Sequence, residues 1–283
     1  MDESRPRPSR LRPGRALAHT PGAFGPGSPH RSDGRSSHTP RGGRHTGPDG
    51  RPGTSPPCSG PADLFPVTPL RFAALLAVPA VLFALLTWQV LTDGPLLRAD
   101  ARLSRALVHP DRFSELLSDL GNAQVAVPVL LVCAGWAAWR RRAIGPDRWW
   151  GAPGAAVLVM AAVPVVVVPF KNWTARPGTP AVPPGTGYFP SGHTATALVA
   201  YGAATLLLLP LLGSARARRA ILAVCGALTL GVSYGLVRRG YHWPLDVAAS
   251  WCLGVVLLTV FARVVRGWSR PRGEPHIDTA PRP

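Results

Sequence analysis

The sequence predicts an all-α membrane protein in which a bundle of six transmembrane helices follows a disordered tail. The first observation is a series of six apolar stretches from Phe72 onward, each close to the roughly 20 residues that a helix needs to cross a bilayer. The second is a change of composition near residue 65. Residues 1–64 are rich in Arg, Pro, Gly, Ser and His, and have too few large apolar side chains to offset the entropy of ordering.

These observations divide the 283-residue chain into a disordered basic tail (1–64), a six-span membrane domain (65–268) and a short polar C-terminal tail (269–283). The N-terminal tail has almost no aromatic residues for base stacking and no nucleic-acid-binding module, so we expect no nucleic-acid partner. Attraction to anionic lipid is the plainer interpretation, and a solvated tail without function is the alternative. No apolar segment with a small-residue cleavage site follows the early arginines, so we expect neither a signal peptide nor a transit sequence.

Hydropathy places the six spans in order along the chain, at 72–91, 123–139, 150–170, 194–212, 220–237 and 245–265. One such stretch would also suit a buried helix of a large soluble protein. Six in succession, separated by arginine-rich or polar connections, indicate a membrane domain.

Arginines in the short connections predict how the spans are oriented, because short cytoplasmic loops carry an excess of positive charge. Three arginine groups fall on one side: Arg140, Arg141, Arg142 and Arg148; Arg216, Arg218 and Arg219; and Arg263, Arg266, Arg270 and Arg272. We therefore expect both termini in the cytoplasm. The opposite connection, 92–121, also carries four arginines, with five acidic residues among them.

This topology brings three polar clusters to the outer face of the membrane. They are KNWTARPGTP at 171–180, FPSGH at 189–193 and RRGYHWPLD at 238–246. Ionisable side chains at membrane depth are costly, so three clusters converging on one face predict a functional site.

Local spacing within the clusters favours an anion. Ser191 is a natural N-cap, with Gly192 and His193 opening the fourth span, so free N–H groups and the positive helix end face outward. Pro244 suits the first turn of the next helix, which places Asp246 near the ring of His242. Two helix N-termini and several cations that share one space suit phosphate.

The same residues suggest a covalent mechanism. A histidine oriented by a carboxylate can act as a nucleophile, which assigns attack to His242 and orientation to Asp246. His193 then serves as the general acid. Lys171, Arg176 and an arginine from the pair Arg238 and Arg239 would bind the phosphate oxygens, together with Ser191 and Gly192. Because no carboxylate cluster for magnesium is present in the sequence, we expect chemistry without a metal or other cofactor.

PSGH and HWPLD, with an upstream K…RP element, resemble the type 2 phosphatidic acid phosphatase family, whose wider superfamily includes the vanadium haloperoxidases. The resemblance covers roughly residues 70–266. It implies a six-helix membrane phosphatase that acts on lipid phosphates or diphosphates through a phosphohistidine. It also implies that His242 is the nucleophile, His193 the acid and Asp246 the partner of His242.

Two positions depart from the family pattern. The first motif of the family has six residues between its lysine and its Arg-Pro pair, whereas Arg176 follows Lys171 after four, and Gly178 takes the usual arginine position. In the third motif the family arginine position is Leu236. On a helix continuing past Leu236, Arg239 lies one turn nearer to His242, so Arg176 and Arg239 are the candidates to replace the missing arginines.

The predicted activity is therefore hydrolysis of a polyprenyl diphosphate or a glycerolipid phosphate at the outer leaflet. A lipid headgroup phosphotransferase would use the same phosphohistidine and differ only in the acceptor. A vanadate-dependent peroxidase is less expected, because those enzymes are largely soluble. A catalytically silent protein that binds anionic lipid is the alternative from another class, although the retention of His193, His242 and Asp246 argues against it.

Overall fold

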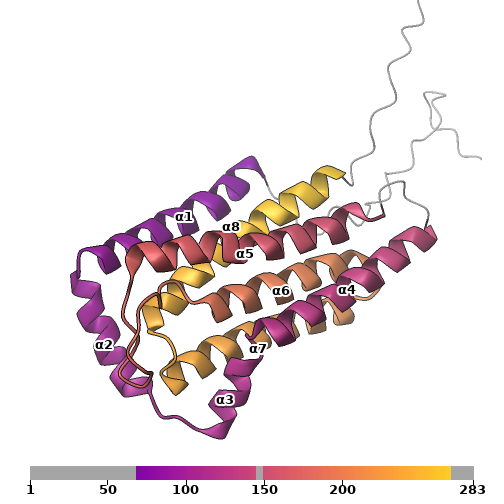
Figure 1. Ribbon diagram of the computed structural model, residues 1–283. Helices are drawn as coiled ribbons and strands as arrows, with labels where there is room; N and C mark the ends of the chain where they lie inside the picture. The colour runs from indigo at the N-terminus through magenta and orange to yellow at the C-terminus, as the bar shows by residue number, and fades with distance from the viewer. Residues whose placement is uncertain (1–67, 145–148, 269–283) are drawn as a thin grey trace, which may run out of the picture. The chain divides into compact units, whose positions relative to one another are not determined.

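The computed structural model describes residues 68–144 and 149–268, and Figure 1 shows their arrangement. The predicted tails, 1–64 and 269–283, lie outside the described residues. Within the described ranges the chain forms eight α-helices and one short 3-10 helix, and its only β pairing is an isolated bridge between Pro177 and Thr186. The predicted all-α class is confirmed.

Six helices are long and apolar enough to cross a membrane, as the sequence predicts. They are α1 (Pro69–Leu91), α4 (Ala123–Ile144), α5 (Gly151–Thr174), α6 (Gly192–Leu208), α7 (Ala215–Arg239) and α8 (Pro244–Trp268). The 3-10 helix η2 (Leu209–Leu211) extends α6. The described part of the chain is thus that of a multi-pass membrane protein.

Helix α6 lies at the centre of the bundle and packs against α4, α5, α7 and α8 (Figure 1). Its sequence, GHTATALVAYGAATLLL, is rich in small residues, which let helices approach closely where lipid supplies no hydrophobic driving force. Helix α1 packs mainly on α8, and its large apolar side chains are mostly exposed. The most buried helix therefore begins with the PSGH motif.

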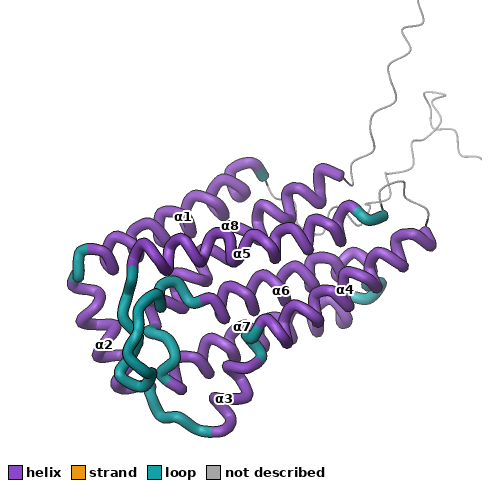
Figure 2. Tube along the Cα trace, viewed as in Figure 1, coloured by secondary structure: helices purple, strands orange, loops and turns teal. Residues whose placement is uncertain are grey.

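Two helices that are shorter than the six candidate spans lie between α1 and α4: α2 (Pro95–Leu107) and α3 (Arg112–Asp119). From sequence we expected a single connection here, at 92–121. Helix α2 contacts α8, α1 and α7, while α3 packs along α7. Figure 2 shows the long 175–191 loop at the same end of the bundle as these two helices.

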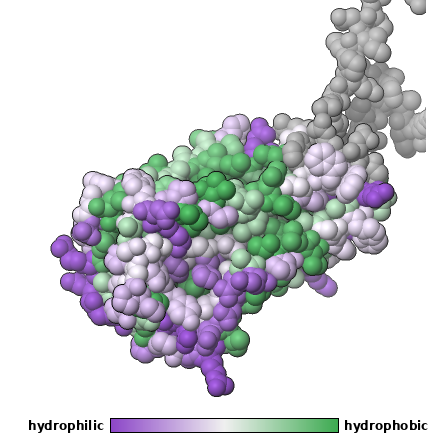
Figure 3. Space-filling view, in the orientation of Figure 1, coloured by the Kyte–Doolittle hydropathy of each residue, from purple (hydrophilic) through white to green (hydrophobic). Residues whose placement is uncertain are grey.

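On the face shown in Figure 3, hydrophobic residues gather over the middle of the helices, and hydrophilic residues gather near α2 and α3. Residues at the ends of α5 and α7 and at the starts of α6 and α8 share that polar end (Figure 1). All three predicted clusters therefore meet at one end of the bundle.

Candidate active site

His242 and Asp246 form the centre of the polar end. His242 lies just before α8, and its Nδ1 is 3.2 Å from Oδ2 of Asp246. Because a carboxylate accepts, Nδ1 of His242 carries the hydrogen and Nε2 is left with a free lone pair. The same Asp246 oxygen accepts from the backbone N–H of Trp243 at 3.1 Å. Both side chains are buried, so the ring is held in one orientation.

The start of α6 is tied to the start of α8. Ser191 is the N-cap of α6, and its Oγ accepts from the Thr194 N–H at 3.3 Å and from the Thr194 hydroxyl at 3.1 Å. The Ser250 hydroxyl bonds to the carbonyls of Ser191 and Asp246, at 2.8 and 2.9 Å. The predicted cap is confirmed, and it fixes the position of the PSGH motif relative to the His242 pair.

His193, in the first turn of α6, has its ring centroid 6.3 Å from that of His242. Its Nε2 lies 2.8 Å from Oδ1 of Asn122, and the Asn122 amide donates to Asp119 at 3.1 Å. The intervening Gly121 makes this approach possible, since a Cβ there would lie 2.7 Å from Val232 and 3.1 Å from the His193 carbonyl oxygen. His193 thus has an orienting partner of its own.

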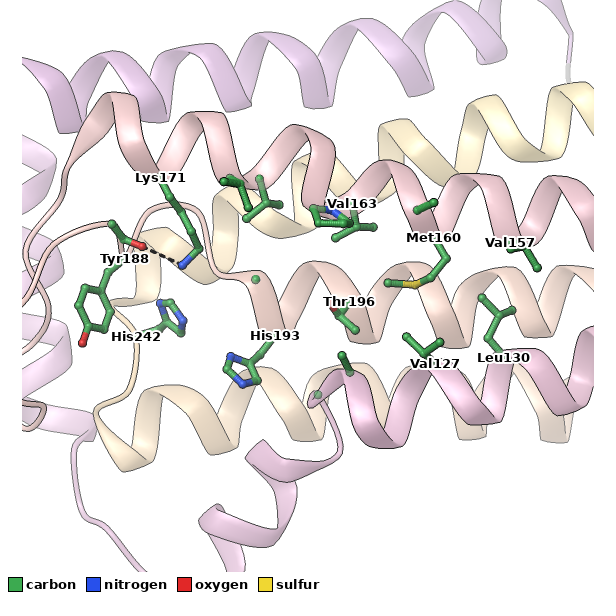
Figure 4. A pocket seen from close by; sticks show the side chains of 18 of the residues that line it. Val127, Leu130, Val157, Met160, Val163, Lys171, Tyr188, His193, Thr196 and His242 are labelled. Atoms are coloured by element: carbon green, nitrogen blue, oxygen red, sulfur yellow. Dashed lines mark hydrogen bonds between the residues drawn. The ribbon is translucent and has the colours of Figure 1, made fainter.

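Lys171, in the last turn of α5, is the one cationic side chain among the described residues that line the large cavity beside the histidines. Its Nζ donates to the Gly187 carbonyl at 2.8 Å, a bond drawn in Figure 4. Gly192 lines the same cavity. Lys171 is therefore placed where an anion next to His242 would meet a positive charge.

Arg176 occupies a different place from the one expected of a phosphate ligand. Its guanidinium is buried between two carboxylates: Nη1 donates to Asp246, and Nη2 donates to Asp100 at 2.6 Å. Arg176 also stacks over the Trp243 ring, at 5.5 Å from the centroid. The structure brings Arg176 to the back of the His242–Asp246 pair rather than into the cavity.

Asp100, on α2, is the member of this cluster that sequence reasoning missed. Burial raises the pKa of the Asp100 carboxyl above its ordinary value, although donation from Arg176 and the Leu245 N–H opposes this effect. Asp100 precedes Arg176 by 76 residues and belongs to no motif, and Asn122 precedes His193 by 71. The sequence offers no local signal for either contact.

Arg238 and Arg239 point towards α3. Arg238 Nε donates to Asp111 at 2.8 Å, while Arg239 lies 3.2 Å from the Tyr241 hydroxyl and 3.7 Å from Glu115. Neither arginine is among the residues that line the large cavity or the smaller cavity beside His193 and His242. The structure therefore does not bring this pair to the other predicted site residues, because α3 supplies nearer carboxylates.

The two departures from the family pattern have direct structural counterparts. Leu236 is fully buried and borders a smaller cavity of about 240 Å³ that also touches His193, His242 and Asn122. At Gly178, a Cβ would lie 2.8 Å from the Tyr188 ring, whose centroid is 5.8 Å from that of His242. An aromatic ring thus covers the position where the family pattern has arginine.

The large cavity has a volume of about 850 Å³ and runs from the histidines along α5 and α4. Figure 4 shows Lys171, Tyr188, His193 and His242 at one end, with apolar side chains following towards Met160 and Val157. Val157 is 43% exposed and Leu131 is 48% exposed, so the apolar part opens to the outside of the bundle.

Comparison with known proteins gives a family match over the part of the chain that carries the polar clusters. Residues 152–270 match the PAP2 superfamily. The PAP2 match extends from α5 to just beyond α8 and includes all three polar clusters. The resemblance to type 2 phosphatidic acid phosphatases inferred from PSGH and HWPLD is thereby confirmed. A search of curated proteins finds no match.

A solved structure shares the fold. The chain is similar to a transmembrane PAP2-type phosphatidylglycerolphosphate phosphatase from Bacillus subtilis, with a TM-score of 0.60 and 20% sequence identity. The alignment covers 70% of this chain and 100% of the solved one. The PAP2 bundle is therefore the architecture of the described membrane part. Among the described residues, no group of three or more His, Cys, Asp or Glu side chains could hold a metal ion, and metal-independent chemistry remains a prediction.

Proposed function

We propose that the protein is an integral membrane phosphatase that hydrolyses a lipid phosphate or diphosphate through a phosphohistidine on His242. The observation that carries the proposal is a polar end and an apolar channel in one cavity. His242, His193 and Lys171 line one end, and aliphatic side chains of α4 and α5 line the rest. An amphiphile whose charged group reacts while its tail stays in lipid matches this division.

The length of the apolar part supports a lipid tail. Lys171 and Val157 both line the cavity and are fourteen positions apart on α5, which corresponds to about 21 Å of helix. One leaflet of the hydrocarbon core is roughly 15 Å thick. The channel is therefore long enough to extend across one leaflet, and its open side lets a tail enter from the bilayer.

In the proposed reaction, the Nε2 lone pair of His242 attacks phosphorus and the bond from phosphorus to the leaving oxygen breaks. The imidazolium of His193 gives its proton to that oxygen. Water then attacks the phosphohistidine, His193 takes a proton from the water, and the N–P bond breaks to release phosphate. Asp246 accepts from Nδ1 throughout and stabilises the positive charge that the ring acquires.

Phosphate binding rests chiefly on Lys171 and on the start of α6, because Asp246 and Asp100 accept from the N–H groups at the start of α8. The N–H groups around Gly192 open α6 beside the cavity, and the positive end of the helix dipole favours an anion there. Ser191 keeps that turn in place through its cap rather than lining the cavity. Arg176 contributes through Asp246, and the arginines at 238 and 239 lie against α3.

We further propose that the site faces the extracytoplasmic side and that both termini are cytoplasmic. Arg140, Arg216 and Arg263 lie at the ends of α4, α7 and α8 that are remote from His242, which supports this orientation under the positive-inside rule. In a cysteine-free background, Pro184→Cys should react with an impermeant maleimide from outside, and Arg216→Cys only after permeabilisation. The reverse pattern would contradict the orientation.

The activity is tested by phosphate release from purified protein in detergent. The panel contains polyprenyl diphosphates, glycerolipid phosphates and a soluble phosphomonoester without a tail, each with and without a chelator. We expect turnover of a tailed substrate that persists in the chelator and is absent from His242→Ala. A preference for the tailless ester, or full activity in His242→Ala, would contradict the proposal.

Phosphotransfer is the second candidate, and the smaller cavity favours it. This space touches both histidines and is lined by polar groups of Asn122, Asp119 and Tyr241, so a hydroxyl acceptor has room beside the phosphohistidine. Adding a short alcohol to the assay separates the two reactions. Hydrolysis alone releases inorganic phosphate at an unchanged rate, whereas transfer yields the alkyl phosphate at its expense.

A further inference from the structure

Asp100 reaches the catalytic cluster from an element outside the six spans. It lies in the middle of α2 and is almost fully buried, as is its arginine partner, with side-chain exposures of 1% and 5%. Oδ2 of Asp100 accepts from Nη2 of Arg176 at 2.6 Å, and Oδ1 accepts from the Leu245 N–H at 2.9 Å. Both oxygens are therefore matched by N–H donors, as a carboxylate requires.

The contacts form a continuous chain of four side chains. Asp100 bonds to one end of the Arg176 guanidinium, Asp246 bonds to the other, and Asp246 also accepts from His242. The Leu245 bond adds a cap in the first turn of α8, one residue before Asp246. Asp100 thus holds Arg176, which bonds to Asp246, and it also holds the first turn of α8, in which Asp246 lies.

The charges of these four side chains balance after His242 has attacked phosphorus, and not in the resting state. Two carboxylates and one guanidinium leave one excess negative charge in a buried space while His242 is neutral. Attack on phosphorus makes the His242 ring cationic, and the cluster then becomes neutral. Without Asp100, Arg176 would neutralise Asp246, and the buried cluster would offer no net negative charge to the cationic ring.

We propose that Asp100 is a positioning residue that balances the charge of Arg176, so that Asp246 can act as a full counter-charge to His242. This inference rests on the proposed phosphohistidine function. Asp100 touches neither the cavity nor the reacting atoms, and it acts only through Arg176 and the start of α8.

Other charged and titratable groups around His242 are common to the wild type and the variants. They come from every neighbouring element and comprise Lys171 on α5, Tyr188 in the 175–191 loop, His193 on α6, Asp119 on α3 and Tyr241 beside His242. Their influence cancels when variants are compared on one substrate. A change in pH dependence between wild type and an Asp100 variant therefore reports the buried cluster.

The test is Asp100→Asn, which keeps the shape and an acceptor for Leu245 but removes the charge. Asp111→Asn is the matched control, because Asp111 also bonds to an arginine and to a helix N–H but lines neither of the two cavities described beside His242. We expect kcat to fall about 10- to 100-fold in Asp100→Asn with little change in KM, and almost no change in Asp111→Asn.

The pH profile separates this role from a structural one. His242 must be neutral to attack, so its protonation sets the acid limb of kcat/KM, whereas loss of the His193 proton sets the basic limb. Removing a nearby negative charge disfavours the imidazolium. The acid limb of Asp100→Asn should therefore move to lower pH by about one unit, while the basic limb stays in place.

The double variant Asp100→Asn with Arg176→Gln restores the excess negative charge, since only Asp246 remains ionised. Its acid limb should return towards the wild-type position even if its thermal stability is lower. Wild-type turnover with an unmoved acid limb in Asp100→Asn would overturn this inference and leave the phosphatase intact. A wild-type protein without turnover on any substrate of the panel would instead overturn the proposed function, and the inference with it.

Discussion

Asp100 and Asp111 lie on the same connection between α1 and α4 and make the same two kinds of contact. Each accepts from an arginine, Arg176 or Arg238, and each accepts from a backbone N–H in the first turn of a helix. They differ in burial. The Asp100 pair is almost fully covered, whereas the side chains of Arg238 and Asp111 are 32% and 40% exposed.

The difference in burial reverses the direction of the pKa shift. Bonds from Ser114 and Arg238 lower the pKa of Asp111 to about 2, because water still solvates its charge. At Asp100 the loss of water outweighs similar donors, and the pKa is raised. An aspartate–arginine contact is thus an exposed ion pair at the start of α3 in one place and a part of the buried His242–Asp246 cluster in the other, and burial separates the two.

The largest effect is expected when the partner of His242 loses its charge. Asp246→Asn should lower turnover by on the order of 10²-fold or more, because an amide no longer holds the reactive tautomer of His242 or its developing charge. His193→Ala should show a loss of similar size through the missing acid. Steady-state phosphate release on the preferred lipid measures both. Near wild-type turnover in Asp246→Asn would remove the basis of the comparison.

Replacing the arginine of each pair should affect stability to very different extents. Arg176→Gln leaves two buried carboxylates without a counter-charge, for which we expect a loss of about 3–5 kcal/mol in the free energy of unfolding. Arg238→Gln opens an exposed pair and should leave the thermal midpoint nearly unchanged. Thermal unfolding of both variants in one detergent decides the point, and equal midpoints would contradict it.

Lys171 and Arg239 are two cations from the predicted site whose expected contributions to substrate binding differ. Lys171 lines the cavity, while Arg239 contacts Tyr241 and Glu115 beside α3. Lys171→Met should lower kcat/KM by roughly 10²-fold, as expected for one lost charge contact to phosphate, and Arg239→Ala by less than about threefold. A larger loss in Arg239→Ala would show that its side chain turns into the site when substrate binds.

The smallest effect concerns the pH dependence at Asp111. Folding lowers the pKa of Asp111 from 3.8 to about 2, so its ionised form stabilises the folded state above pH 3.8. That contribution is lost as the pH falls towards 2. Asp111→Asn should therefore unfold slightly earlier than wild type at pH 6, and the two thermal midpoints should converge near pH 2. A gap that persists at low pH would assign the effect to packing.

The parts of this molecule that sequence predicts are those decided by neighbours along the chain. Apolar length defines the six spans, the Ser191 cap follows from its place before Gly192, and the four-residue spacing brings Asp246 to His242. Asp100 and Asn122 could not be found in this way. Their contacts depend on how α2 and the α3–α4 turn pack on distant helices, which no local pattern encodes.

Arg238 and Arg239 show that a correctly predicted helix does not by itself predict which groups its side chains contact. Helix α7 does continue through Arg239, as the geometric argument requires. Helical rotation alone does not decide what a side chain meets, because that depends on the neighbouring element. Helix α3 packs along this stretch and supplies Glu115 and Asp111, which attract the two guanidinium groups.

The positions of Asp100 and Asn122 in the sequence decide which fragments of the protein would contain a complete site. The family match begins at residue 152, after both of these side chains. A fragment cut at that boundary would keep every motif residue and still lack the partner of Arg176 and the partner of His193. A unit that keeps the whole site therefore starts upstream of the family match, and a split version of the protein should show the proposed activity only when a piece containing α2 to α4 is supplied in trans.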